Sequence, residues 1–131
     1  ERFLVCSTVI GIIAQRLLRK NCPYCLEDFF MTASEAESLG LRLKGNGKIK
    51  LKRGAGCLKC RGTGYLGRVA TIEVMPFSER LKQVTMSGED SSVLKKVARS
   101  EGMSTLRENA LRIMIKGDTT YQEVLRVTTE D

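Results

Sequence analysis

Two short cysteine motifs, CPYC at residues 22–25 and CLKC at residues 57–60, decide how the middle of the chain folds. In a C-x2-C motif a tight turn directs both sulfur atoms to one side, so each motif supplies two corners of a tetrahedron. Two motifs complete a four-sulfur site, and four thiolates leave no open position for a water molecule. The spacing therefore predicts a structural zinc site rather than a catalytic one. Its predicted ligands are Cys22, Cys25, Cys57 and Cys60.

Three other interpretations of the cysteines compete with a metal site. Disulfide bonds are disfavoured because the five cysteines form an odd count and the sequence shows no signal-peptide pattern. A thioredoxin-like redox site uses one C-x2-C motif rather than two. Purely buried thiols fit poorly with the glycine-rich surroundings of the second motif, and no further signature of an iron–sulfur cluster is present. The fifth cysteine, Cys6, is expected in the hydrophobic core.

The composition excludes several kinds of catalytic site. The chain has no histidine, which rules out a Ser-His-Asp triad, a Cys-His pair and any imidazole metal ligand. The phosphate-binding motif GxxxxGK[ST] is also absent, because Gly40 and Gly45 have the right spacing but Asn46 stands where the lysine is required. We therefore expect no ATP hydrolysis by these residues alone.

The positive charge is confined to the first half of the chain. Residues 1–64 hold 12 basic and 5 acidic side chains, which accounts for the whole net charge of +7, whereas residues 65–131 hold 10 of each. Residues 42–53 contain six basic and no acidic side chains. Such an excess attracts nucleic acid, anionic lipid or an acidic protein surface, although a solvated basic face explains it equally well.

The segment between the two motifs is long enough to carry structure of its own. It has 31 residues, more than the roughly 15–20 of a compact zinc ribbon. Thr32 followed by Glu35 predicts the start of a short helix that ends at Gly40. Residues 48–52 alternate lysine with isoleucine and leucine, which predicts a half-exposed strand.

Before the first motif, residues 2–14 are apolar on all faces and predict a buried helix, with a strand followed by a helix as the alternative. Gln15 and Arg16 interrupt the apolar run well before the roughly 20 residues that a membrane span needs. The start of the chain at Glu1, close to this apolar element, indicates a segment of a longer protein.

After the second motif the pattern predicts one strand and then about four short helices. Residues 68–75 alternate and are rich in β-branched side chains, and Pro76 ends the strand. Ser78 and Asp90 or Ser91 are suitable helix caps. Thr105 with Glu108 and Thr120 with Glu123 form two further capping boxes, and Gly117 suits a helix end. The predicted fold class is α+β.

Three longer strings carry a family resemblance. They are LVCSTVIGIIAQRLLRKNCPYC at 4–25, GCLKCRGTGYLGRVATIEVM at 56–75 and ARSEGMSTLRENALRIMIKGDTTYQEVLRVT at 98–128. Together and in this order they resemble the carboxyl-terminal part of the secretion ATPases, the hexameric motors of type II secretion and type IV pilus assembly. The resemblance implies that the Walker A loop, the Walker B acid and the histidine box all precede Glu1.

The resemblance also implies a division of the chain. Residues 1–20 would be the last helix and a strand of the RecA-like α/β core, and residues 21–64 the tetracysteine zinc-binding insert. Residues 65–75 would return as a core strand beside residues 15–20. Residues 76–131 would form the C-terminal helical subdomain.

By the same resemblance, the zinc is structural, and ATP and Mg²⁺ bind only in the full-length parent. The implied partners are neighbouring ATPase subunits of a homo-hexamer and an inner-membrane platform protein, with an anionic lipid surface as a further partner. The implied location is the cytoplasm, peripheral to the bacterial inner membrane. Gln15, Arg16 and Arg68 lie either against a neighbouring subunit or nucleotide, or in an ion pair at the sheet edge.

Two rival functions remain. A zinc ribbon with the basic strand at 42–53 would bind nucleic acid, but that stretch lacks the aromatic side chains on which bases stack. The sequence CLKCRGTG at residues 57–64 also follows C-x2-C-x-G-x-G, the repeat of the DnaJ-type chaperone zinc domain. That domain needs several such repeats, and the first cysteine motif here lacks the trailing glycines.

Overall fold

The protein is described by a computed structural model that covers residues 1–41, 43 and 47–128. Within these residues the chain folds into six helices and two antiparallel two-stranded sheets, so the α+β class is confirmed. The elements in order are α1 (Arg2–Thr8), β1 (Gly11–Asn21), β2 (Leu26–Thr32), α2 (Ala33–Ser38), β3 (Lys48–Gly54), β4 (Tyr65–Pro76), α3 (Glu79–Met86), α4 (Ser91–Ser100), α5 (Leu106–Ile115) and α6 (Tyr121–Val127).

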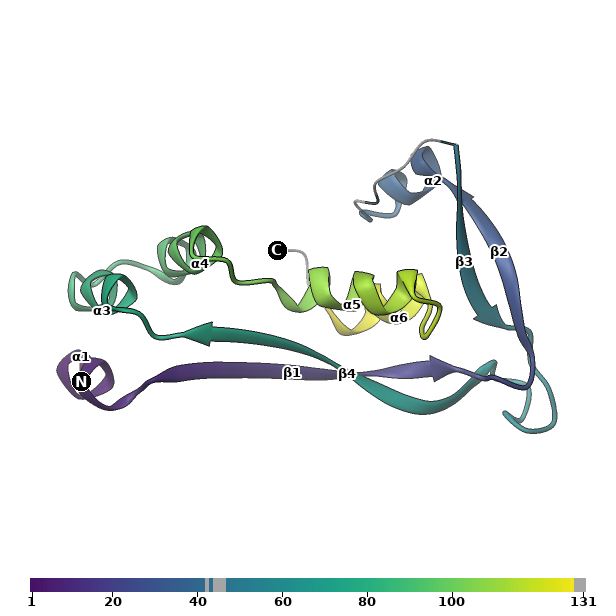
Figure 1. Cartoon of the computed structure of the whole chain (residues 1–131), viewed down its shortest axis with the longest axis horizontal. Helices are drawn as coiled ribbons and strands as arrows, with labels where there is room; N and C mark the ends of the chain where they lie inside the picture. The colour runs from purple at the N-terminus through teal and green to yellow at the C-terminus, as the bar shows by residue number, and fades with distance from the viewer. Residues whose placement is uncertain (42, 44–46, 129–131) are drawn as a thin grey trace.

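The longest feature is the twisted ribbon formed by β1 and β4 (Figure 1). Its register runs from Gly11 opposite Pro76 to Asn21 opposite Tyr65, with an irregularity after Arg19. The pairing of residues 65–75 with residues 15–20 that the resemblance implied is therefore confirmed. The ribbon joins α1, α3 and α4 at one end to the cysteine motifs at the other (Figure 1).

The buried helix predicted for residues 2–14 is wrong over its second half, and its first half contains no buried residue. The alternative, a strand followed by a helix, has the order of the two elements reversed. The helix α1 ends at Thr8, and a strand begins at Gly11. The β-branched residues Ile12 and Ile13 lie opposite Met75 and Val74 of β4, and this cross-strand pairing outweighs the helical reading of an all-apolar run.

Between the cysteine motifs, β2 and β3 form a hairpin with α2 at its tip (Figure 1). The strand β3 and the helix α2, which is capped by the Thr32 hydroxyl, confirm the sequence predictions for this segment. The strand β2 was not predicted. Its signal is the alternation of the inward-facing Phe29 and Met31 with the exposed Asp28 and Phe30.

The helices after β4 begin where their caps predict. Ser78, Asp90 and Thr105 cap α3, α4 and α5, and Thr105 with Glu108 forms a complete reciprocal capping box. The second predicted capping box is wrong in one half. The Thr120 hydroxyl does cap α6, but the Glu123 carboxylate turns away to bind arginines.

The buried side chains form two clusters. The larger one joins the hairpin and Leu18 to α5 and α6 through Met31, Leu51, Met114 and Val124. The smaller one joins α3 to α4 around Phe77 and Leu81, and Cys6 is half-buried against it. Among the described residues, every helix is too short or too polar to cross a bilayer.

Candidate metal centre

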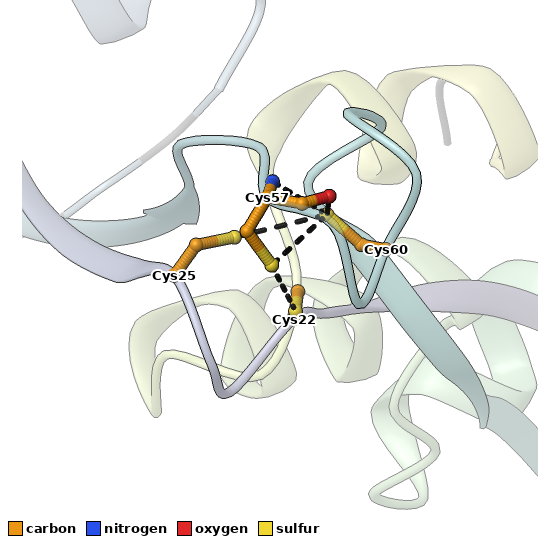
Figure 2. Close-up of side chains that lie close together, drawn as sticks. All are labelled: Cys22, Cys25, Cys57 and Cys60. Carbon is orange, nitrogen blue, oxygen red and sulfur yellow. Dashed lines mark hydrogen bonds between the residues drawn. The ribbon is translucent and has the colours of Figure 1, made fainter.

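The four cysteines of the two motifs converge on one point (Figure 2). Their sulfur atoms all lie within 4.8 Å of one another, although the two motifs are far apart in sequence. The sulfur atoms of Cys22 and Cys57, of Cys25 and Cys60, and of Cys57 and Cys60 are each 3.8 Å apart. The structure therefore brings together all four residues that the sequence predicted as ligands.

These distances match the size of a tetrahedral metal site. A regular tetrahedron with a zinc–sulfur distance of about 2.3 Å has edges of about 3.8 Å. All four sulfur atoms belong to free thiols, and Cys22 and Cys60 are buried. A pure thiolate set of this size suits Zn²⁺, which prefers soft sulfur ligands in tetrahedral geometry. The donor set thus fits a closed structural site.

Backbone N–H groups point at the sulfur atoms. The amide of Gly56 donates to Cys25 Sγ, and the amides of Cys57 and Gly64 donate to Cys60 Sγ, each at 3.2 Å. Burial raises the pKa of the Cys25 thiol to about 12. Burial also raises the pKa of the Cys60 thiol, but the two backbone donors outweigh burial and lower this pKa to about 6. These donors stabilise the negative charge that a metal-bound thiolate carries.

Two glycines, Gly54 before the second cysteine motif and Gly64 after it, allow their backbones to come into contact. A Cβ atom on Gly54 would lie 2.1 Å from the carbonyl oxygen of Gly64, and one on Gly64 would lie 2.4 Å from that of Gly54. Gly64 also has a φ of +82°, which favours glycine. The Gly64 carbonyl then accepts the amide of Cys22, which fixes the first motif against the second.

The outer ends of the motifs are exposed and basic. The Lys59 ammonium lies 5.3 Å from the centre of the Tyr24 ring, and the Leu58 side chain is 97% exposed. Arg61 is exposed beside them, and no acidic residue occurs within either cysteine motif.

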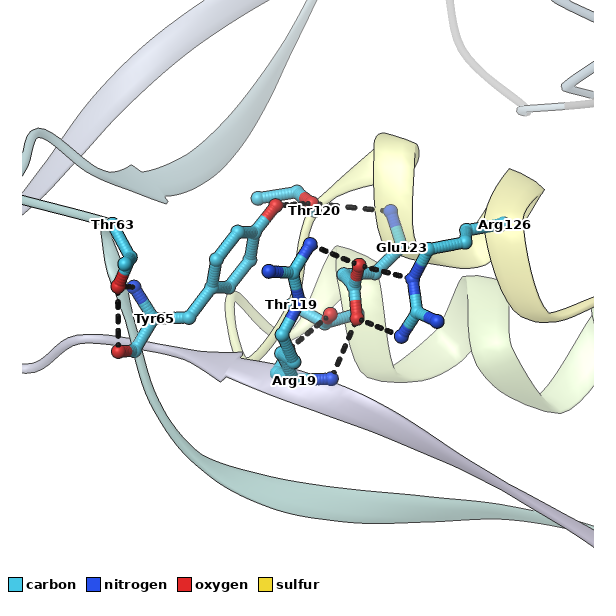
Figure 3. Close-up of polar contacts among 7 residues, drawn as sticks. All are labelled: Arg19, Thr63, Tyr65, Thr119, Thr120, Glu123 and Arg126. Atoms are coloured by element: carbon cyan, nitrogen blue, oxygen red, sulfur yellow. Dashed lines mark hydrogen bonds and ion pairs between the residues drawn. The ribbon is translucent and has the colours of Figure 1, made fainter. Parts of the chain in front are cut away.

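A polar cluster at the base of the hairpin was not predicted from the sequence (Figure 3). Glu123 is fully buried and binds the backbone amide of Arg19 and the guanidinium groups of Arg19 and Arg126 at 2.8–2.9 Å. Burial raises the pKa of this carboxyl, but the arginine and amide donors outweigh burial and lower it to about 2. The only sequence signal was a glutamate at the capping position of α6, which pointed to a different partner.

The basic strand β3 is partly neutralised by its neighbour β2. Lys50 and Lys52 both pair with Asp28 of β2, and Arg53 pairs with Glu27 at 2.9 Å. Of the basic stretch at 42–53, Arg42 and Lys44 lie outside the described residues, as do Gly45 and Asn46. The four basic side chains of β3 thus face two carboxylates, which halves the charge that the described part of this strand offers to a polyanion.

Gln15, Arg16 and Arg68 lie on the β1–β4 ribbon, away from the cysteines. All three are exposed, and Arg68 lies opposite Arg19 in the register. Within the described residues neither Arg16 nor Arg68 forms an ion pair, so an ion pair at the sheet edge is absent there.

Comparison with known proteins gives a consistent result. Residues 1–126 match the family described as Type II/IV secretion system protein. The chain is 39% identical over 132 residues to the Type IV pilus assembly ATPase PilB of Myxococcus xanthus, covering all of this chain and 23% of that protein. It is 35% identical over 130 residues to PilB of Thermus thermophilus, covering 99% of this chain and 15% of that protein.

A third relative is the Type II secretion system protein E of Pseudomonas aeruginosa, which is 35% identical over 131 residues and covers all of this chain. The chain spans 26% of the length of that relative and 15% of the Thermus protein. The similarity therefore extends over nearly the whole chain but over only about a quarter or less of each relative.

Proposed function

The chain belongs to the Type II/IV secretion system protein family, and from that membership we propose that it is the carboxyl-terminal, zinc-binding and helical portion of a hexameric secretion or pilus-assembly ATPase. The full-length protein would power protein secretion or pilus extension, and would bind ATP and Mg²⁺ outside these residues. The observation that carries the proposal is the four-sulfur cluster in a chain that matches the family over residues 1–126.

Zinc would stabilise the position of the β2–β3 hairpin relative to the rest of this portion. The hairpin between the motifs shares its apolar core with α5 and α6 instead of closing a core of its own. Ligation of zinc in small modules contributes about 10–16 kcal/mol, which is enough to hold such a hairpin in place. The role of the residues described here would be structural, together with contacts to neighbouring subunits and docking to an inner-membrane platform protein.

The β1–β4 ribbon supports the proposal that residues 1–20 and 65–75 are a remnant of a RecA-like core. One face packs on the helices, where the Glu73 carboxylate accepts the amide of Leu106. The other face exposes a row of apolar side chains to solvent. These are Ile13, Leu17, Ile72 and Val74. Exposed apolar rows of this kind mark surfaces that further protein covers, which is what the strands of a larger core require.

The proposed location is the cytoplasm, at the inner membrane through protein partners. An anionic lipid surface would meet the exposed basic ends of the cysteine motifs, Lys59 and Arg61.

Complementation of the full-length ATPase tests this function. Serine at both Cys22 and Cys57 removes one ligand from each motif, and we expect it to abolish secretion or pilus formation, whichever the parent supports. Cys6→Ser is the matched control, because Cys6 packs against the smaller buried cluster around Phe77 and Leu81, away from the four-sulfur site. This variant should retain activity. Full secretion or pilus formation by the double variant would overturn the proposal.

The nucleic-acid alternative is disfavoured by the ion pairs on β3. A mobility-shift titration separates the two functions, because binding through phosphate contacts falls steeply as salt rises. We expect no shift of DNA or RNA at low salt, and a salt-sensitive shift would revive that alternative. The DnaJ-type alternative needs further glycine-flanked cysteine motifs, which the chain does not contain.

A further inference from the structure

The turn between α5 and α6 contacts the chain on both sides of the cysteine motifs. On one side it reaches Arg19 and Asn21, three residues and one residue before Cys22, and on the other it reaches Tyr65, five residues after Cys60. We propose that these contacts form a base clamp that couples metal binding to the docking of α6. The base clamp consists of Arg19, Asn21, Tyr65, Thr119, Thr120 and Glu123. The proposal rests on the metal site proposed above.

Asn21 is the centre of the base clamp. Its side-chain amide is buried, and its two N–H groups are shared among the carbonyl oxygens of Gly117 at 2.9 Å, Lys52 at 3.2 Å and Thr119 at 3.3 Å. Its own backbone amide donates to Asp118 at 2.9 Å. One residue next to a ligand therefore holds β1, β3 and the α5–α6 turn together.

Arg19 is held by two partners, Thr119 in the turn and Glu123 in the first turn of α6. The Thr119 hydroxyl donates to its carbonyl oxygen at 2.8 Å, and the buried Glu123 accepts its amide at 2.8 Å and its guanidinium at 2.9 Å (Figure 3). A buried carboxylate with this many donors has few alternative positions without losing bonds. The contacts of Glu123 with Arg19 therefore fix the position of the end of β1, and with it the position of Cys22.

Tyr65 closes the base clamp from the returning strand. Its hydroxyl lies 2.7 Å from the Thr120 hydroxyl, and its ring lies beneath the Arg19 guanidinium at 4.2 Å. The Thr63 hydroxyl, which binds the Cys60 carbonyl at 2.7 Å, accepts the Tyr65 amide at 3.1 Å. A continuous set of hydrogen bonds thus runs from a ligand residue to the cap of α6.

The coupling has to act in both directions. If a docked α6 holds the two motifs at their ligating distance, metal binding must in turn stabilise the docked α6 by the same factor. The helix α4 belongs to the other buried cluster and makes no base-clamp contact within the described residues, so it should respond much less. Residues that orient ligands from outside typically change metal affinity by about 10- to 100-fold when removed.

Competition titration of Co²⁺ and Zn²⁺ on the 131-residue chain tests the positioning role. We expect Asn21→Ala to weaken metal affinity by about tenfold or more and to alter the cobalt–thiolate absorption. The matched control is Asn109→Ala, because Asn109 also donates its side-chain amide to two carbonyls, those of Ile72 and Ser104, but lies far from the motifs. We expect the control to change affinity by less than about twofold.

Tyr65→Phe is the second variant, because it removes one hydroxyl, keeps the ring and should fold. It should also weaken metal affinity. Amide hydrogen exchange measures the reverse effect, the stabilisation of the docked α6 by bound metal. Zn²⁺ should slow exchange in residues 118–127 by about tenfold more than in residues 91–100.

The outcomes separate the two proposals. If the wild-type chain develops no cobalt–thiolate band, the metal site and the coupling both fail. If the wild type binds metal but Asn21→Ala and Tyr65→Phe bind it as tightly as Asn109→Ala does, only the coupling is overturned. Equal slowing of exchange in both segments would overturn it too.

Discussion

Gly54 and Gly64 show how single residues set the metal centre. Each carries no side chain because the backbone of the other occupies that space, so any Cβ would push the two arms of the site apart. In the sequence these glycines are part of the glycine-rich surroundings of the second cysteine motif. It does not reveal that they face each other, because that contact depends on the hairpin between them.

Gly54→Ala should therefore destabilise the zinc-loaded protein by about 1–3 kcal/mol or more and weaken metal binding. Thermal unfolding and chelator competition measure the two effects. Gly11→Ala is the control, because its Cβ would meet its nearest neighbour, Met75 O, at an ordinary 3.6 Å. Equal melting temperatures for the two variants would refute the close approach of Gly54 and Gly64.

Glu123 gives the protein a defined sensitivity to acid. Its pKa is about 2 in the folded chain, below the ordinary value of 4.5, so the unfolded chain takes up the proton first as pH falls. The stabilisation is complete above pH 4.5 and is lost progressively between about 4.5 and 2. We expect the free energy of unfolding to fall across that interval.

Denaturant titration at several pH values measures this loss. Because metal binding itself depends on pH, the informative quantity is the difference in unfolding free energy between wild type and Glu123→Gln at the same zinc concentration. That difference should shrink as pH falls towards 2. A difference that is constant from pH 7 to pH 3 would contradict the assignment of Glu123.

At the scale of elements, local signals were reliable where a side chain bonds to its own backbone neighbours. Thr32, Ser78, Asp90 and Thr105 cap helices as predicted, since that chemistry spans only three residues. Local sequence signals failed where pairing with a segment distant in the sequence determines the secondary structure. The run at residues 11–14 becomes a strand because β4 pairs with it, and β2 forms because Phe29 and Met31 pack into the core that β3 and the helices share.

The capping box of α5 offers a direct test at this scale. Thr105→Ala removes both the cap of Glu108 N and the geometry for the returning carboxylate, so we expect a loss of about 1 kcal/mol or slightly more. Thr85→Ala is the control, because the Thr85 hydroxyl only donates within α3 and should cost less than about 0.5 kcal/mol. Equal losses in chemical denaturation would argue against the cap.

At the scale of the whole molecule, the same buried cluster joins the hairpin, the ribbon and the last two helices. The sequence predicted the four ligands because their spacing is local within each motif. It did not predict that the β2–β3 hairpin packs against α5 and α6. It also did not predict the hydrogen bonds of Asn21 and Glu123, which connect β1 to the α5–α6 turn and to α6. Those contacts bridge about a hundred residues, for which a single sequence has no periodic signal.

The exposed apolar face of the ribbon makes a further whole-molecule prediction. The 131-residue chain should self-associate as concentration rises, because Ile13 is 71% exposed within an apolar row. Ile13→Glu should reduce this association in light scattering. Leu58→Glu is the control, since Leu58 is more exposed but stands alone at the tip of a cysteine motif. An equal reduction by both variants would show that the row has no special role.

Zinc stoichiometry tests the central claim, the four-cysteine metal site, most directly. Elemental analysis of the freshly purified, reduced chain should find close to one zinc per chain. Cys6→Ser should retain it, and serine at both Cys22 and Cys57 should lose it. A reduced, folded chain without zinc, or one that keeps its zinc after the loss of both ligands, would contradict the account.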